Sequence, residues 1–301
     1  MIRLHDFKML QILLQSLTKS IPESLKVYGS IFHIIRGNPF NLEVLVDSWP
    51  DYQTVITRPQ KQEMMDDKDH YANTYHIFSK DLQKLPEILT SDDVINWRQN
   101  LTIQGCQKAL NEKISDIVVS KAVQVDYSNR ILYIADTVLK SITSNTSKLM
   151  TSHEAANSEN WAFKRTNDNF KPSLMDVSHA ELVNNNWKYG KNEMSLRFVK
   201  RCLQNFPGCC LLNPEGSPIS WVIMEHSGEL RMGYTLPEYQ NKGMGKKLGS
   251  AYFQYLQKSD IPYYCHADKI NIQSHSISKS LGLRVIDCGW HEWKCIPAKH
   301  F

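Results

Sequence analysis

The chain has 301 residues, of which 42% are hydrophobic and 22% charged, and this length suits about two domains of roughly 150 residues each. Its 13 glycines and 12 prolines fall below average usage, which excludes disordered, collagen-like and low-complexity proteins. The 35 basic and 31 acidic residues leave a net charge of +4. Because nucleic-acid-binding proteins usually concentrate a large basic excess on one face, we expect no nucleic-acid partner.

The seven cysteines are odd in number, form no C-x-x-C pair and lie mostly in apolar runs, so we expect free thiols in a reducing compartment. The sequons at Asn100 and Asn145 matter only in a secreted protein, and no signal-peptide pattern precedes them. The apolar runs also fall short of the roughly 18 residues that cross a bilayer. The sequence therefore predicts a protein that is not secreted and has no membrane span.

The first half begins with an amphipathic helix that ends before Pro22, on which Leu4, Phe7, Leu10, Leu14 and Leu17 recur at helical spacing. Strands are predicted over residues 26–35, 42–46, 53–57 and 130–135, and one or two helices over residues 91–121, starting at Ser91.

Residues 141–169 are rich in Ser, Thr and Asn and show little periodicity, as is typical of an interdomain connection. We place the boundary there, which gives domains over residues 1–165 and 166–301.

The second half predicts a mixed α/β domain. It opens with helices over residues 178–187 and 193–205. An antiparallel meander follows, with strands over residues 209–213, 219–225 and 229–235. After a glycine-containing loop come a helix over 245–258, a strand over 262–266, a helix over 271–281 and final strands over 284–287 and 292–296.

The loop between the meander and the next helix has a pattern suited to an anionic ligand. It reads Gln240-Asn-Lys242-Gly243-Met244-Gly245-Lys246-Lys247. Glycines let the backbone approach a ligand, while the amides of a first helical turn and the lysines offset negative charge. The pattern is neither a P-loop nor a dinucleotide-binding fingerprint. The alternative is a tight loop with solvated lysines.

The loop resembles the pyrophosphate-binding loop [Q/R]-x-x-G-x-[G/A] of the Gcn5-related N-acetyltransferase superfamily, and the order of the predicted elements fits that superfamily. Nearly the whole chain resembles one branch of it, the glycine N-acyltransferases and their like-proteins. The segments that carry this resemblance are Leu25-Lys-Val-Tyr-Gly29, Gly37-Asn-Pro-Phe-Asn41, Asp69-His-Tyr-Ala-Asn-Thr-Tyr75, Ile95-Asn-Trp-Arg98, Met175-Asp-Val-Ser-His179, Cys209-Cys-Leu-Leu212, Gly228-Glu-Leu-Arg-Met232 and Thr235-Leu-Pro-Glu-Tyr239.

The resemblance implies an α/β (α+β) fold made of two acetyltransferase-like halves, each with a mixed, mostly antiparallel sheet flanked by helices, the N-terminal half being degenerate. It implies acyl transfer from acyl-CoA, the co-substrate, to the amine of glycine or a similar amino acid such as glutamine, by direct attack and without a metal. It also implies a mitochondrial location, with the cytoplasm as the alternative, and we expect a monomer.

Within the strand over residues 229–235, alternation predicts one polar face with Glu229, Arg231, Gly233 and Thr235, opposite Leu230, Met232 and Tyr234. A carboxylate on that face can take the proton that an amine must lose before attack, and Glu229 stands where the family's proposed general base stands. The alternative is a solvated carboxylate at a strand start. Arg231 is either an ion-pair partner or a ligand for the acceptor's carboxylate.

The resemblance assigns the acyl-CoA contacts to two groups of residues. Strand amides at Met232, Gly233, Tyr234 and Thr235 would bind the pantetheine and the thioester oxyanion. The expected contacts in and after the loop are Gln240, Lys242, Gly243, Met244, Gly245, Lys246 and Asn271. For Asn271, a structural role at a helix N-terminus is the alternative.

One departure concerns the residue that protonates the leaving thiolate. Superfamily members often carry a tyrosine where this chain has Ser278. Since thiols have pKa values of about 8.5, the thiolate can leave near neutral pH without that acid. Because of this departure, a second candidate function is a non-catalytic acyl-CoA binder or scaffold. A third is an acyltransferase acting on peptide amines.

Three other groups of residues are candidates for a catalytic or binding site. Cys265 and His266, with Asp268 and His275 nearby, suggest a cysteine nucleophile, but neighbours on a strand point to opposite faces, so a buried cysteine is expected. The Asp66-Asp67-x-Asp69-His70 loop lacks the glycine and glutamate of a calcium loop. The aromatic residues Tyr263, Tyr264, Trp290 and Trp293 are expected in the core, with the lining of an acyl pocket as the alternative.

Overall fold

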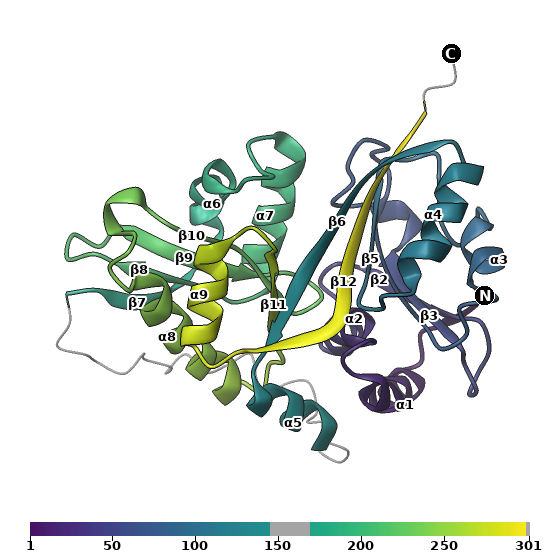
Figure 1. Cartoon of the computed structure of the whole chain (residues 1–301), viewed down its shortest axis with the longest axis horizontal. Helices are drawn as coiled ribbons and strands as arrows, with labels where there is room; N and C mark the ends of the chain where they lie inside the picture. The colour runs from purple at the N-terminus through teal and green to yellow at the C-terminus, as the bar shows by residue number, and fades with distance from the viewer. Residues whose placement is uncertain (145–168, 299–301) are drawn as a thin grey trace. The chain divides into compact units, whose positions relative to one another are not determined.

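The computed structural model describes residues 1–144 and 169–298. The chain divides into two compact units, which we call the N-terminal unit (Met1–Leu132 with Ile286–Phe301) and the C-terminal unit (Tyr133–Val285; Figure 1). The predicted boundary after residue 165 lies outside the described residues. The last strand groups with the N-terminal unit, whereas the sequence-based division assigned it to the second domain.

The N-terminal unit carries seven strands in the order β1-β2-β3-β4-β5-β12-β6. Its elements are β1 (Ile2–Leu4), α1 (Phe7–Leu17), α2 (Leu25–Ile35), β2 (Leu42–Val46), β3 (Thr54–Pro59), β4 (Thr74–Ser79), α3 (Leu85–Thr90), β5 (Leu101–Gly105), α4 (Leu110–Ser120), β6 (Val123–Ile134) and β12 (Arg284–Pro297). Neighbours from β1 to β4 are antiparallel, β4 and β5 are parallel, and β12 is antiparallel to β5.

In residues 133–144 and 169–285, the C-terminal unit carries five strands in the order β11-β10-β9-β8-β7. Its elements are α5 (Asp136–Ser144), β7 (Lys171–Met175), α6 (Ala180–Asn186), α7 (Glu193–Asn205), β8 (Gly208–Leu212), β9 (Pro218–Met224), β10 (Glu229–Thr235), α8 (Met244–Lys258), β11 (Tyr264–Asp268) and α9 (Ile272–Ser280). Neighbours from β7 to β10 are antiparallel, and β10 and β11 are parallel.

The two units repeat one order of elements. In each, a strand is followed by two helices, three antiparallel strands, a helix, a strand parallel to the preceding one, and a further helix. The next strand along the chain is β6 after α4 and β12 after α9, and β12 groups with the N-terminal unit. Both sheets are therefore mixed and mostly antiparallel, with helices packed on them, which confirms the predicted fold class. In the N-terminal unit β12, not β6, occupies the place beside β5.

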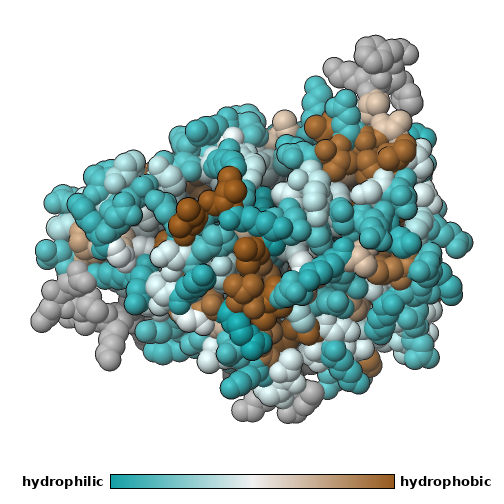
Figure 2. Space-filling view, in the orientation of Figure 1, coloured by the Kyte–Doolittle hydropathy of each residue, from teal (hydrophilic) through white to brown (hydrophobic). Residues whose placement is uncertain are grey.

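Helices cover both faces of the C-terminal sheet. On one face α8 buries Leu248, Tyr252 and Leu256, and Tyr252 reaches the carbonyl oxygen of Pro207. On the other, α7 places Cys202 close to Arg231 of β10. The visible surface of the molecule is mainly hydrophilic, with apolar residues in separate patches (Figure 2).

Several predictions for the N-terminal half are wrong. Residues 25–35 form helix α2, not a strand; the apolar, β-branched composition reflects a helix buried on all sides from Leu25 to His33. Leu4 lies in β1, because Asp6 caps α1 through the Met9 amide (2.9 Å) and so starts the helix at Phe7. Strand β5 interrupts the helical segment predicted over 91–121, and β4 and β7 were not predicted.

Candidate active site

Strand β10 contains a bulge at the position where the amides were expected to bind the thioester. Arg231 pairs with Ile223 and Tyr234 with Trp221, so β10 advances three residues while β9 advances two. Met232 takes a positive φ of 58°, and Gly233 next to it is exposed. The bulge thus presents backbone between two ladder pairs, where a ligand can approach it.

The bulge changes which side chains share a face. Partners across a sheet lie on the same face, so Arg231 and Tyr234 share one face with Ile223 and Trp221. Thr235 lies on the other, where its hydroxyl bonds that of Ser220 (2.7 Å). The predicted alternation is right as far as Arg231. It is wrong beyond it, because the extra residue moves each later side chain to the opposite face.

Strands β10 and β11 pair over a short distance. Their parallel register covers Glu229↔Tyr264 and Leu230↔Cys265, the first two residues of each strand, and both strands continue beyond it. The bulge lies in the part of β10 beyond this pairing. An acyl-CoA arm could therefore reach the exposed backbone of Gly233 without displacing the paired residues.

The glycine loop ends at the N-terminus of α8. Gly243 is the capping residue, with φ of 76° and no side chain, so it leaves the first-turn amides to an outside acceptor. Lys242 and Lys246 are exposed beside it. Gln240 donates from Nε2 to the carbonyl oxygen of Thr235 (2.9 Å), which ties the loop to the end of β10. The arrangement suits a diphosphate.

Two residues expected to bind the cofactor have structural roles. A Cβ on Gly245 would lie 2.7 Å from Cδ1 of Ile277, so glycine lets α9 approach α8 here without displacing the end of that side chain. Asn271 caps α9, its side-chain oxygen accepting from the Ser274 amide (3.0 Å).

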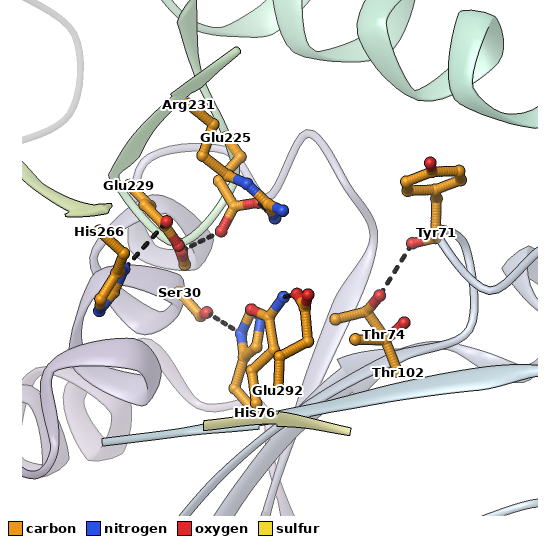
Figure 3. Close-up of polar contacts among 12 residues, drawn as sticks. Ser30, Tyr71, Thr74, His76, Thr102, Glu225, Glu229, Arg231, His266 and Glu292 are labelled. Carbon is orange, nitrogen blue, oxygen red and sulfur yellow. Dashed lines mark hydrogen bonds and ion pairs between the residues drawn. The ribbon is translucent and has the colours of Figure 1, made fainter. Parts of the chain in front are cut away.

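Glu229 is buried, with 1% of its surface exposed, so the alternative of a solvated carboxylate is wrong. Its Oε1 lies 2.9 Å from Nδ1 of His266, whose side chain is also buried (Figure 3). Sequence reasoning used His266 to reject a cysteine nucleophile and missed this pair. The signal is tertiary, because it depends on the register of two parallel strands.

Arg231 forms an ion pair with Glu225, with Nη1 of the arginine 2.8 Å from Oε2 (Figure 3). Ser227 donates to the other oxygen of Glu225 (2.6 Å), and the Tyr264 hydroxyl donates to Ser227 (2.9 Å). The guanidinium also lies 5.8 Å from the ring centroid of Trp187. Of the two roles considered for Arg231, the structure shows the ion pair.

The rival cysteine nucleophile fails on geometry and on acidity. Cys265 lies on the face of Leu230, away from His266. Burial raises the pKa of its thiol to about 12, against a lowering by a hydrogen bond with Ser278. A thiol with this pKa stays protonated at neutral pH and is a poor nucleophile. His275 is hydrogen-bonded instead to the hydroxyl of Tyr133 (2.7 Å).

The acidic loop and the aromatic residues have structural roles. Asp69 accepts from the amides of Tyr71 and Ala72, both at 3.1 Å. Residues 1–144 and 169–298 contain no cluster of metal-ligating side chains, and none of their helices is long and apolar enough to span a bilayer. All four aromatic side chains are buried. Tyr263 and Tyr264 belong to the C-terminal unit, and Trp290 and Trp293 to the N-terminal unit.

The N-terminal unit repeats the topology of this site without its chemistry. The register of β3 and β4 runs without a shift from Thr54↔Ser79 to Thr57↔His76. Residues 80–84, which lead into α3, contain no glycine, and α3 has 6 residues where α8 has 15. The features expected for acyl-CoA binding are therefore those of the C-terminal unit.

Comparisons with known proteins identify the family. The family described as aralkyl acyl-CoA:amino acid N-acyltransferase matches residues 1–207, and its C-terminal region matches residues 209–297. The chain is 50% identical to glycine N-acyltransferase-like protein 2 of Homo sapiens, covering all of both chains. It is 46% identical to glycine N-phenylacetyltransferase of Bos taurus, covering 99% of this chain and 100% of the relative.

Solved structures support the fold. A Drosophila protein from a structural genomics programme has a TM-score of 0.73 at 14% identity, covering 98% of each chain. A tandem Gcn5-related acetyltransferase from the clavulanic acid pathway has a TM-score of 0.52 at 11% identity, covering 100% of this chain and 99% of that one. Given the family match over nearly its whole length, the chain belongs to the aralkyl acyl-CoA:amino acid N-acyltransferase family.

Proposed function

We propose that the chain transfers an acyl group from acyl-CoA to the amine of glycine or a similar amino acid such as glutamine. The observation that carries this proposal is the buried Glu229 on a strand that bulges two residues further along, beyond its pairing with β11. Relatives named glycine N-acyltransferase, such as that of Homo sapiens at 45% identity over 99% of both chains, support the same reaction.

Acyl-CoA binding is assigned to the C-terminal unit. The diphosphate would lie at the N-terminus of α8, against the amides that follow Gly243 and beside Lys242 and Lys246. The pantetheine would pair with the amides of the bulge at Met232 and Gly233. With these contacts the thioester would lie next to β10, within the reach of groups on the face of Glu229.

The proposed chemistry is a direct attack. The carboxylate of Glu229 takes a proton from the ammonium group of the acceptor, directly or through a water. The amine nitrogen then bonds to the thioester carbon, and bulge amides stabilise the oxyanion. The carbon–sulfur bond breaks and its electron pair leaves on the CoA sulfur. The second nitrogen proton passes to that thiolate or to solvent.

The test is release of CoA thiol from mixtures of acyl-CoA and amino acids by the purified full chain. We expect release that depends on both substrates, and a loss of about 10²- to 10⁴-fold in kcat for Glu229→Gln with unchanged CoA affinity by calorimetry. The matched control is Glu238→Gln, which should retain activity, because Glu238 is an exposed carboxylate just before the glycine loop. A chain that binds no CoA, or a Glu229→Gln variant as fast as the parent, would overturn the proposal.

Ser278, in place of the superfamily's tyrosine, favours a second candidate, a non-catalytic acyl-CoA binder. Binding of CoA without turnover for every amino acid would support this candidate, and formation of acylated polypeptide would support the peptide acyltransferase. A mitochondrial location is a further proposal, which rests on the resemblance and is testable by fractionation.

A further inference from the structure

The pair formed by Glu229 and His266 follows from the register of β10 and β11. Glu229 lies opposite Tyr264, so His266, two residues further along β11, is on the same face, and Cys265 is on the other. The imidazole Nδ1 lies 2.9 Å from Oε1 of the carboxylate, and the side chains are 0% and 1% exposed. The histidine thus contacts one defined oxygen of the carboxylate inside the protein.

The other charged groups near this pair are engaged with one another. Arg231 pairs with Glu225 through Oε2, and Ser227 donates to Oε1 of the same carboxylate. The thiol of Cys265, on the opposite face of the sheet, is close enough to Glu229 for their charges to interact, but its pKa of about 12 keeps the thiol neutral at physiological pH. Burial of a charge without a compensating donor is costly, and His266 contacts the buried carboxylate of Glu229 at 2.9 Å.

A general base needs both an accessible oxygen and a fixed orientation. If Oε1 accepts from His266, the carboxylate cannot rotate, and Oε2 has a defined direction in which to meet the amine. Misplacement of a reacting group by about 1 Å costs on the order of 100-fold in rate. A donor that holds Oε1 therefore acts on the reaction without touching the substrate.

We infer that His266 is a positioning residue that holds Glu229 through Oε1 and directs its second oxygen toward the acceptor amine. This inference rests on the proposed function and deepens it. No covalent bond to His266 forms or breaks: the proton of the amine goes to Glu229, while the imidazole keeps its contact with Oε1 and stabilises the carboxylate between turnovers.

Two substitutions separate positioning from packing. His266→Asn keeps a donor at the place of Nδ1 and loses the ring, whereas His266→Phe keeps the ring volume and loses the donor. We expect kcat to fall about 100-fold in His266→Phe and less than about tenfold in His266→Asn, with CoA affinity unchanged in both. A purely structural role predicts the reverse order. Cys265→Ala, the neighbour on the opposite face, is the control and should keep the parent kcat.

The pH profile gives a second readout. Without a donor a buried carboxylate is harder to ionise, so the acid limb of kcat/KM should move to higher pH in His266→Phe, and less in His266→Asn. Packing damage alone would lower the rate and leave the limb in place. Glu225 and Arg231 lie beside this pair and Tyr264 shares its face, while the thiol of Cys265, on the opposite face, interacts with Glu229 electrostatically. Glu225→Gln is therefore measured beside the His266 variants, to show that the acid limb does not belong to the second carboxylate.

Failure of this inference is distinct from failure of the proposed function. If the parent chain releases no CoA with any acceptor, the proposed function fails. If the parent turns over and His266→Phe matches it in kcat and in pH profile, the inference alone fails. The double variant Glu229→Gln, His266→Phe should be as slow as Glu229→Gln, because residues that act as one unit are not additive, and fully additive losses would also overturn the inference.

Discussion

The side chain of Leu281 occupies the space that a side chain on Gly249 would need, with Cγ of the leucine 3.3 Å from the position of an added Cβ. Gly249 is buried in α8, and Leu281 follows the last turn of α9. The close approach of the two helices therefore depends on glycines along α8 as much as on apolar contacts.

Gly249→Ala should lower the free energy of unfolding by about 1–3 kcal/mol, the usual cost of overpacking. Gly245→Ala should cost less, because the atom displaced is the terminal Cδ1 of Ile277, a residue 37% exposed and able to move. Urea denaturation of both variants checks this order. Equal losses at the two positions would contradict it.

Gly243→Ala should lower the free energy of unfolding by about 1 kcal/mol, because its φ of 76° is unfavourable for alanine. It should also weaken CoA binding about tenfold, because the amides that follow Gly243 are the proposed diphosphate site. Gly216→Ala is the matched control: φ there is 83°, and at both glycines the space for a Cβ is open. It should lose similar stability and keep CoA affinity. Calorimetric titration with CoA distinguishes the two variants. If both lost the same affinity for CoA, the N-terminus of α8 would not be the binding site.

Arg231→Met should lower the free energy of unfolding by about 3–5 kcal/mol, because it leaves the carboxylate of Glu225 buried without its guanidinium. Combining it with Glu225→Gln should recover most of that loss. If the single variant does not fold, Arg231→Lys gives a milder test by thermal unfolding. A large rise in acceptor KM with unchanged stability would instead support binding of the acceptor's carboxylate.

Stability should fall in alkaline solution. Burial raises the pKa of the Cys210 and Cys295 thiols to about 12, so in the folded chain they stay protonated up to that pH, while in the unfolded chain they ionise from about pH 9. The raised pKa values contribute stability below pH 9 that is lost as pH rises toward 12. Between pH 8 and 10 each thiol should lower the free energy of unfolding by about 1.4 kcal/mol. Urea denaturation at both pH values checks this, and Cys295→Ala should reduce the decline by that amount.

The elements of the C-terminal half could be predicted because their signals are local. Asn192 caps α7 through the Ser195 amide (2.9 Å), and the apolar residues of that helix recur on one side. The glycine loop was read correctly as the start of a helix, since Gly243 takes the positive φ that glycine favours. Segment 25–35 was read wrongly, because a helix buried on all sides has no polar face to reveal its period.

Tertiary structure decided the details of the site. The bulge at Met232 shifts the faces of Tyr234 and Thr235, and its signal in the sequence is a glycine inside the strand, Gly233, which does not fix where the extra residue falls in the ladder. Gly245 lies against Ile277 of the neighbouring helix, which only the packing of α9 reveals.

By itself the amino-acid sequence determined the class of fold and the resemblance to a family, and it made Glu229 the candidate base, because these depend on composition, local pattern and motif. Only the folded chain decided that Glu229 is buried, that Arg231 is engaged with Glu225, and that His266 contacts the carboxylate. The physical reason is that burial and ion pairing depend on which strands lie side by side and in what register, and register is set by the packing of the whole sheet.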